Sequence, residues 1–176
     1  MTVKQFFLLP VMAIMLLLLS PANAAEQGTV QAIIPWEGEG RVFQVETNTI
    51  IFLGSMEGVM YVESSDGDLH EAFVLCPIMQ ELDLETGASN AIGRCEITVS
   101  SVDVIYAKLD CEGIVGECAG EFTVIDGEGK FTGITGVGKL SVRSPMHALV
   151  ADLSGGALLR VASGLAVIKD LKYSIP

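Results

Sequence analysis

From residue 25 onward, the chain consists of short runs rich in Val, Ile, Phe, Tyr and Thr that are separated by Gly, Asp and Ser. The apolar residues of this region show no helical periodicity, and short strand-forming runs with turn residues between them are typical of β-sandwiches and β-barrels. The expected strands lie at 29–34, 41–46, 49–53, 59–63, 70–76, 79–84, 95–100, 104–110, 120–125, 138–143, 159–163 and 171–175. The sequence therefore predicts an all-β protein.

Patterns within and between the runs agree with this prediction. Apolar and polar residues alternate in the runs at 95–100 and 171–175, which places one face of each strand in a core. Asp66-Gly67 predicts a two-residue hairpin turn, because both residues tolerate positive φ. No linker, low-complexity stretch or fixed-period repeat divides the region, so residues 25–176 are expected to form one domain.

The first 24 residues have the pattern of a secretory signal peptide. Lys4 precedes an uncharged apolar run at 6–19, and Ala22-Asn23-Ala24 fits the small-x-small pattern that signal peptidase accepts. Cleavage is expected between Ala24 and Ala25. The run is short for a bilayer-spanning helix, which needs about 20 apolar residues, so an uncleaved anchor is the disfavoured alternative. We expect an exported protein, periplasmic or secreted, with no membrane insertion after cleavage.

The mature chain is strongly acidic. Its ten Lys and Arg fall to nine when Lys4 is removed, against 22 Asp and Glu, which gives a net charge of −13. Such a charge repels phosphate backbones and anionic lipid surfaces, and the cations form no cluster, so we expect no nucleic-acid partner. The charge supports solubility but does not identify a partner.

An even number of cysteines in an exported chain indicates disulfides. The four cysteines are Cys76, Cys95, Cys111 and Cys118. Four cysteines can form two disulfides in three different ways. A zinc site is disfavoured, because structural zinc prefers Cys-x2–4-Cys spacing and the closest pair here has six residues between its members. Four free thiols are the alternative for a reducing compartment.

Hairpin geometry suggests how the cysteines pair. A tip at Glu85-Thr86-Gly87 makes the numbers of paired residues sum to 171 and puts Cys76 opposite Cys95. A tip at 113–116 makes them sum to 229 and puts Cys111 opposite Cys118. Directly opposed strand residues can come within disulfide reach. We therefore expect two bridges within local hairpins, each worth about 2–3 kcal/mol on the chain-entropy model.

The glycine-rich segment at 126–140 nearly matches a phosphate-binding loop. Four residues separate Gly133 from Gly138, and Lys139 follows, but Leu140 stands where a Ser or Thr hydroxyl should bind magnesium. No helix start follows to direct its dipole at phosphate. We expect these glycines at bends and bulges where strands of a curled sheet approach closely.

The same segment carries a family resemblance. Phe122-Thr123-Val124-Ile125 followed by Gly127-x-Gly129-x-Phe131-x-Gly133-x-x-Gly136-x-x-Lys139-Leu140 resembles the late strand pair of allene oxide cyclases and, more loosely, of plant dirigent proteins. The motifs Cys111-x-Gly113, Cys118-x-Gly120 and Leu75-Cys76-Pro77 flank it. With them, the chain most resembles uncharacterised exported bacterial proteins that have allene oxide cyclase-like barrels.

The resemblance implies a closed antiparallel β-barrel of about eight strands whose interior holds an apolar ligand. In the cyclases, ring closure comes mostly from substrate folding inside the cavity, and an early Pro- and Asn-containing segment supplies the polar groups that steer it. That segment has no match here, so no catalytic residue is assigned. The expected runs outnumber eight strands, so some of them must merge or lie outside the barrel.

The chain has few residues that could form another kind of catalytic or metal-binding site. It has only His70 and His147, neither in a recognisable motif, and no Gly-x-Ser-x-Gly elbow. Calcium requires a loop that supplies five or six spaced oxygens. The carboxylates near turns do not form such a loop; these are Asp66, Asp68, Asp83 and Glu85. We expect no metal and no cofactor, and nothing supports a paired-carboxylate hydrolase.

Aromatic residues are the candidates for a ligand site. Trp36, the only tryptophan, lies in the turn-like stretch Pro35-Trp36-Glu37-Gly38. At a barrel mouth it could line a pocket, with Glu37 steering a polar ligand end, or it could plug the barrel bottom. Tyr61 and Tyr106, in mid-strand, could point inward with their hydroxyls available, or pack outward.

Three functions are carried forward from the sequence. The first is a non-enzymatic module that binds a small apolar or amphipathic molecule in the barrel, and the second is a cyclase or isomerase that confines a reactive intermediate. The third is a packed structural or interaction protein. A cavity of about 300 Å³ or more with apolar walls favours the first two. An outer-membrane barrel is disfavoured by an aromatic content of 6%. The oligomeric state does not follow from the sequence.

Overall fold

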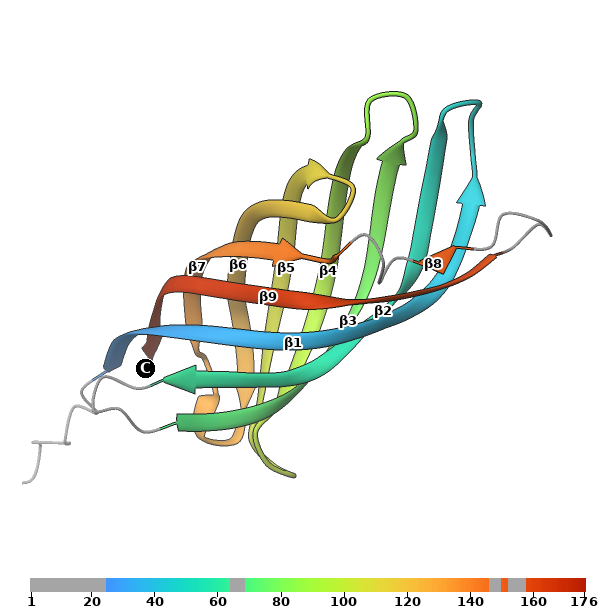
Figure 1. Ribbon diagram of the computed structural model, residues 1–176. Coiled ribbons are helices and arrows are strands. Elements are labelled where there is room, and N and C mark those ends of the chain that lie inside the picture. The colour runs from blue at the N-terminus through green and yellow to red at the C-terminus, as the bar shows by residue number, and fades with distance from the viewer. Residues whose placement is uncertain (1–24, 64–68, 146–149, 152–157) are drawn as a thin grey trace, which may run out of the picture.

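A computed structural model describes residues 25–63, 69–145, 150–151 and 158–176 (Figure 1). The expected signal peptide, the Asp66-Gly67 turn and His147 lie outside the described residues. The strands are β1 Glu26–Gln44, β2 Thr49–Glu63, β3 Leu69–Asp83, β4 Ala88–Thr98, β5 Val104–Ile114, β6 Glu117–Glu128, β7 Thr135–Arg143, β8 Val150–Ala151 and β9 Leu158–Ile175. A single 3-10 turn, η1 Gly129–Phe131, joins β6 to β7. No helix of the described part is long and apolar enough to cross a membrane.

The strands form a closed antiparallel barrel. From β1 to β7 each strand pairs with the next one along the chain, and β7 pairs with β9. Strand β9 returns to pair with β1, from Glu26↔Ile175 to Val42↔Leu158. Eight strands close the ring, because the short β8 pairs with β9 beyond the end of β7. The prediction of an all-β, closed antiparallel barrel of about eight strands is confirmed.

Several breaks that the sequence analysis placed between strands were wrong. The runs at 29–34 and 41–46 belong to β1, and the runs at 159–163 and 171–175 belong to β9. The runs within 49–63 and within 70–83 likewise merge into β2 and β3. Most of these breaks contain glycines, which do not turn the chain here but face the inside of the barrel.

Inward glycines make room for aromatic rings. Gly40 and Gly54 are opposite each other on β1 and β2, and the ring of Phe52 lies across both. A Cβ placed on Gly54 would lie 2.9 Å from the Cα of Gly40 and 2.5 Å from Cζ of Phe52. Trp36 packs in the same way on Gly38 of its own strand and Gly164 of β9. Glycine inside a strand thus marks a close approach, as the sequence analysis expected for the 126–140 segment.

A layer of buried side chains fills the middle of the barrel. We call it the central layer, and it consists of Ala32, Ile34, Val74, Cys76, Cys95, Ala107, Leu140, Ala166 and Ile168, each at most 4% exposed. Every closing strand except β2 and β6 contributes to it. The layer separates inward-facing residues near one end of the barrel from those near the other.

The first disulfide joins Cys76 and Cys95 inside the central layer. Leu75 pairs with Glu96 and Ile78 with Gly93, so the two cysteines are directly opposed with their Cα atoms 4.1 Å apart. This is the register that the tip at Glu85-Thr86-Gly87 predicted.

The second disulfide joins Cys111 and Cys118, but in a different register from the expected one. The strands continue to Ile114 and Glu117, which leaves a two-residue turn in place of the four-residue tip at 113–116. Cys111 therefore lies opposite Gly120, and the bond runs diagonally between Cα atoms 5.6 Å apart. With all four cysteines in disulfides, the zinc and free-thiol alternatives do not hold in this structure.

We predict that Gly54→Ala lowers the free energy of unfolding by about 1–3 kcal/mol, because the added methyl group would clash with the Glu39 carbonyl and overpack the contact between Phe52 and Gly40. Chemical unfolding followed by far-ultraviolet circular dichroism measures the change. Glu57→Ala is the control, since Glu57 is exposed on the outer face of the same strand. Equal stability of Gly54→Ala and the native protein would contradict the packing described above.

Candidate ligand cavity

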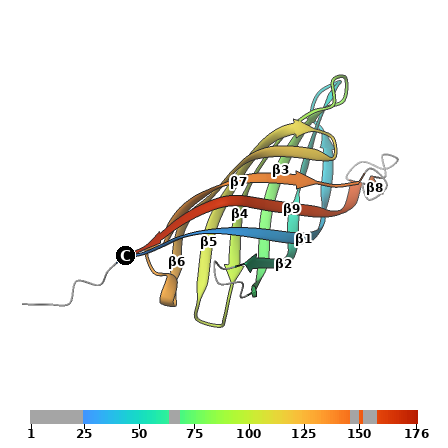
Figure 2. The same cartoon turned by 60° about the vertical axis from the view of Figure 1, so that its left-hand side comes forward.

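A cavity that we call the larger cavity opens at the end of the barrel where β1 begins and β9 ends. Figure 2 shows the C-terminus at this end. The cavity has a volume of about 710 Å³. Its lining comes from the first residues of β1, β3 and β5, the last residues of β2, β4, β6 and β9, and the segment around η1. All the strands of the ring except β7 thus contribute to one hollow.

The floor of the larger cavity is apolar. It is formed by inward side chains that are at most 8% exposed, namely Met60, Ile97, Phe122, Val124, Ile134 and Leu171. Except for Ile134, which precedes β7, these side chains point inward because of the two-residue period of strands, in which adjacent residues face opposite sides of the sheet. In the run at 171–175, the residues on the inward face of the strand, Leu171, Tyr173 and Ile175, all line the cavity.

Polar and charged groups gather at the rim. They are Glu26, His70, Lys130 and Tyr173. Oη of Tyr173 donates a hydrogen bond to Oε1 of Glu26 over 3.4 Å. Burial raises the pKa of the Tyr173 phenol, and the adjacent Glu26 carboxylate raises it further. Tyr173 is therefore protonated at neutral pH and can serve as a hydrogen-bond donor.

Two glycines position Tyr173. Gly28 of β1 and Gly136 of β7 are its partners on the neighbouring strands. A Cβ on Gly28 would lie 2.7 Å from the phenol ring, so only glycine leaves room for the ring there. Closure between β1 and β9 brings Glu26 beside Tyr173, although the two residues lie 147 positions apart in the chain.

The η1 turn covers one side of the larger cavity with Phe131 and Lys130. Lys130 Nζ lies 5.0 Å from the centre of the Phe131 ring, within the range of a cation–π contact. The turn is held by Asp103, whose Oδ1 accepts from the backbone N–H of Lys130 over 3.1 Å and whose Oδ2 lies 3.9 Å from Lys130 Nζ. Ser100 Oγ also donates to Asp103 over 3.0 Å.

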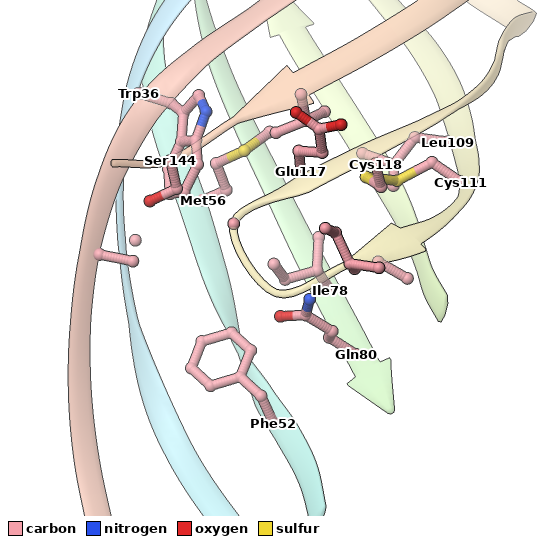
Figure 3. Close-up of a pocket in the computed structure, with 16 residues that line it drawn as sticks. Trp36, Phe52, Met56, Ile78, Gln80, Leu109, Cys111, Glu117, Cys118 and Ser144 are labelled. Atoms are coloured by element: carbon pink, nitrogen blue, oxygen red, sulfur yellow. A yellow bond between two sulfur atoms is a disulfide. The ribbon is translucent and has the colours of Figure 1, made fainter. Parts of the chain in front are cut away.

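The smaller cavity lies at the opposite end, around Trp36 (Figure 3). Its volume is about 90 Å³, and no residue lines both cavities. The central layer lies between them. On β1, for example, Gly28 and Val30 line the larger cavity, Trp36 and Gly38 line the smaller one, and Ala32 and Ile34 are buried between the two.

The structure does not bring the expected site residues together. Trp36 lines the smaller cavity, whereas Glu37 is exposed on the outer face because neighbours in a strand point to opposite sides. Tyr61 is also on the outer face, 36% exposed. Tyr106 is outside too, because its neighbour Ala107 is buried inside, and its Oη donates to Glu128 over 2.7 Å, which raises the pKa of the phenol.

Sequence reasoning missed the residues that define the larger cavity. His70, to which the sequence analysis assigned no role, lies near the start of β3 and lines the rim. The alternation at 171–175 could have identified Tyr173 as inward. No local signal could have identified Glu26, because its place depends on pairing between the two ends of the described chain.

Two comparisons with known proteins found no relative of this chain. Neither a scan against protein-family models nor a search of curated proteins gave a match.

We predict that Asp103→Asn weakens folding at neutral pH and that the loss disappears in acid. The Lys130 amide, the Ser100 hydroxyl and the Lys130 charge lower the pKa of Asp103 in the folded protein. The carboxylate thus stabilises the fold above its unfolded pKa of about 4, and this contribution is lost as the pH falls through the lower folded pKa.

Urea unfolding of the native protein and Asp103→Asn across this pH range tests the prediction. Asp110→Asn is the control, because Asp110 is exposed on the outer face of β5. A stability difference that does not shrink with falling pH would contradict the role assigned to the Asp103 charge.

Proposed function

We propose that this protein binds a small apolar or amphipathic molecule in the larger cavity. The observation that carries the proposal is a hollow of about 710 Å³ with an apolar floor and a polar rim. Ligand pockets for small molecules typically measure about 300–1,000 Å³ and combine apolar walls with a few polar groups that orient the ligand. A packed structural barrel has no need of such a hollow.

The distribution of polar groups favours an amphipathic ligand. An apolar part would lie on the floor around Phe122 and Leu171, both at most 8% exposed. A polar end would lie at the rim, where the Tyr173 hydroxyl, which donates to Glu26, can accept a hydrogen bond and Lys130 and His70 offer further polar contacts. Such an arrangement fixes which end of the ligand enters first.

A non-enzymatic role is favoured over a cyclase or isomerase. Efficient proton transfer uses groups whose pKa lies near the ambient pH, whereas the pKa of Tyr173 is raised from an already high value. This phenol suits steady hydrogen bonding. An enzyme that acts only by confinement would use the same cavity, and product analysis distinguishes it from a binder.

The proposal includes an allene oxide cyclase-like fold and an exported location. The closed eight-stranded antiparallel barrel agrees with the first. The two disulfides are consistent with an oxidising compartment such as the periplasm or the exterior of the cell.

The neutral fluorophore N-phenyl-1-naphthylamine tests the cavity directly. We predict that it binds the native protein with enhanced emission, and that Ala72→Phe weakens binding by about tenfold or more because the ring fills the cavity. Ala119→Phe makes the same change on the outer face of β6 and should leave binding unchanged.

Native mass spectrometry of protein purified from its own compartment extends this test. A retained small-molecule mass that Ala72→Phe loses and Ala119→Phe keeps supports the ligand role. A clean unliganded mass together with no fluorophore binding overturns it. Conversion of the retained molecule on incubation would favour the cyclase or isomerase.

A further inference from the structure

The smaller cavity contains a buried hydrogen-bond donor that has no acceptor. Among the described residues, Nε1 of Trp36 is the one buried side-chain nitrogen or oxygen without a partner. The indole N–H can only donate, and buried donors in folded proteins nearly always have a partner. The side chains facing it in Figure 3, such as Met56, are mainly apolar.

The Trp36 ring is held in place by glycine contacts. A Cβ on Gly164 would lie 2.8 Å from Cζ2 of the ring, and a Cβ on Gly38 would lie 3.3 Å from Cζ3. The ring edge thus fills the space that two side chains would otherwise take. These contacts hold the ring where its N–H is buried at the cavity.

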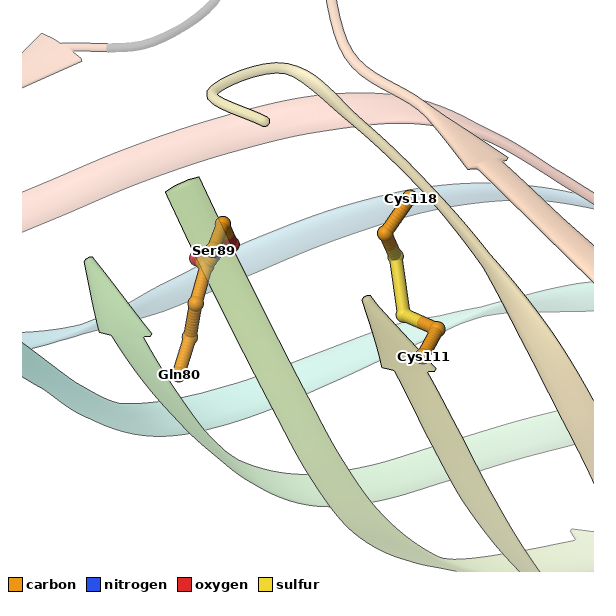
Figure 4. The surroundings of a disulfide bond; sticks show 4 residues. All are labelled: Gln80, Ser89, Cys111 and Cys118. Atoms are coloured by element: carbon orange, nitrogen blue, oxygen red, sulfur yellow. A yellow bond between two sulfur atoms is a disulfide. The ribbon is translucent and has the colours of Figure 1, made fainter. Parts of the chain in front are cut away.

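The other polar side chains of the smaller cavity already have partners, and Ser144 Oγ donates to the Ser163 carbonyl over 2.6 Å. Gln80 Nε2 donates to Ser89 Oγ over 2.6 Å, and Figure 4 shows the two side chains directed at each other from β3 and β4. Glu117 lies 3.8 Å from Nη2 of Arg143, and both side chains are largely exposed. The Glu117 carboxylate at the cavity edge disfavours an anion, and no buried carboxylate is present to attract a cation.

The tip of the β5–β6 hairpin covers this cavity. Val115 N–H donates to the Gly87 carbonyl over 3.1 Å, and Ser144 N–H donates to the Gly116 carbonyl over 2.7 Å. The tip is thereby tied to the β3–β4 turn on one side and to the end of β7 on the other. The Cys111–Cys118 disulfide joins the two strands just below the tip. The cover is thus a fixed part of the fold.

We propose that the smaller cavity is a second binding site, for a neutral single-ring or short-chain molecule with one hydrogen-bond acceptor. The acceptor, a ketone or ester carbonyl oxygen, accepts a hydrogen bond from the N–H of Trp36. The carbon skeleton packs on Met56, Phe52 and Leu109. The volume of about 90 Å³ limits the ligand to this size class. The site is independent of the proposed function of the larger cavity.

Two shape-matched probes test the proposal. Cyclohexanone carries the acceptor, and methylenecyclohexane has a CH2 group in place of the oxygen. Each cavity has its own methionine reporter, Met56 in the smaller and Met60 in the larger, so ¹³C-methyl NMR shows which one is occupied. Trp36 is the only tryptophan, so its indole N–H gives a single ¹⁵N-correlated signal.

Cyclohexanone is expected to shift the Met56 methyl signal and to move the indole N–H signal downfield, with the Met60 signal unchanged. Methylenecyclohexane is expected to shift Met56 without the downfield movement. In Trp36→Phe, the preference for cyclohexanone over methylenecyclohexane should fall by about fivefold to tenfold, the value of one neutral hydrogen bond. Ala72→Phe, which fills the larger cavity, should leave the cyclohexanone titration unchanged.

The proposal is overturned if cyclohexanone leaves the Met56 and indole signals unmoved, or if it shifts Met60 alone. An unchanged preference in Trp36→Phe also overturns it. Should that variant fail to fold, the indole signal of the native protein decides the matter. Loss of fluorophore binding at the larger cavity with retention of cyclohexanone at Met56 would remove the proposed function and leave the second site standing.

Discussion

Contact between large inward side chains and inward glycines is the interaction on which the closed barrel depends. An eight-stranded barrel has an interior just wide enough for side chains to fill, so bulky and minimal residues must alternate around it. Phe52 lies across Gly40 and Gly54, and Tyr173 lies against Gly28. These contacts let neighbouring strands bend strongly while the lumen stays packed. The long strands β1 and β9 can then meet and close the sheet.

The same packing divides the lumen into two chemically different cavities. The central layer, which includes the Cys76–Cys95 bridge, fills the narrow middle of the barrel. Beyond it, the larger cavity has an apolar floor and a charged rim, whereas the smaller cavity is mainly apolar and contains the unpartnered indole N–H of Trp36. One fold therefore offers an amphipathic site at one end and a small neutral site at the other. The second disulfide holds the hairpin that covers the smaller site.

Local sequence rules predicted the elements better than their limits or the site. Strand-forming runs and the tip at Glu85-Thr86-Gly87 obey short-range preferences, and the register of the Cys76–Cys95 hairpin followed from them. The breaks at Gly38 and Gly54 were wrong, because a glycine that accommodates a ring from its own or a neighbouring strand looks the same in sequence as a glycine in a turn. Alternation could locate Tyr173, but the cavity rim as a whole requires knowing that the sheet closes between its first and last strands.

Closure between β1 and β9 is the claim on which both cavities rest, and methyl–methyl nuclear Overhauser effects measure it most directly. Ala32 pairs with Ile168, and Ile34 pairs with Ala166 on the neighbouring strand. In ¹³C-methyl-labelled protein, the closed barrel predicts cross-peaks within each of these pairs. Absence of both, with the four methyl groups showing contacts only to β2 or to β7, would mean an open sheet and would contradict the account.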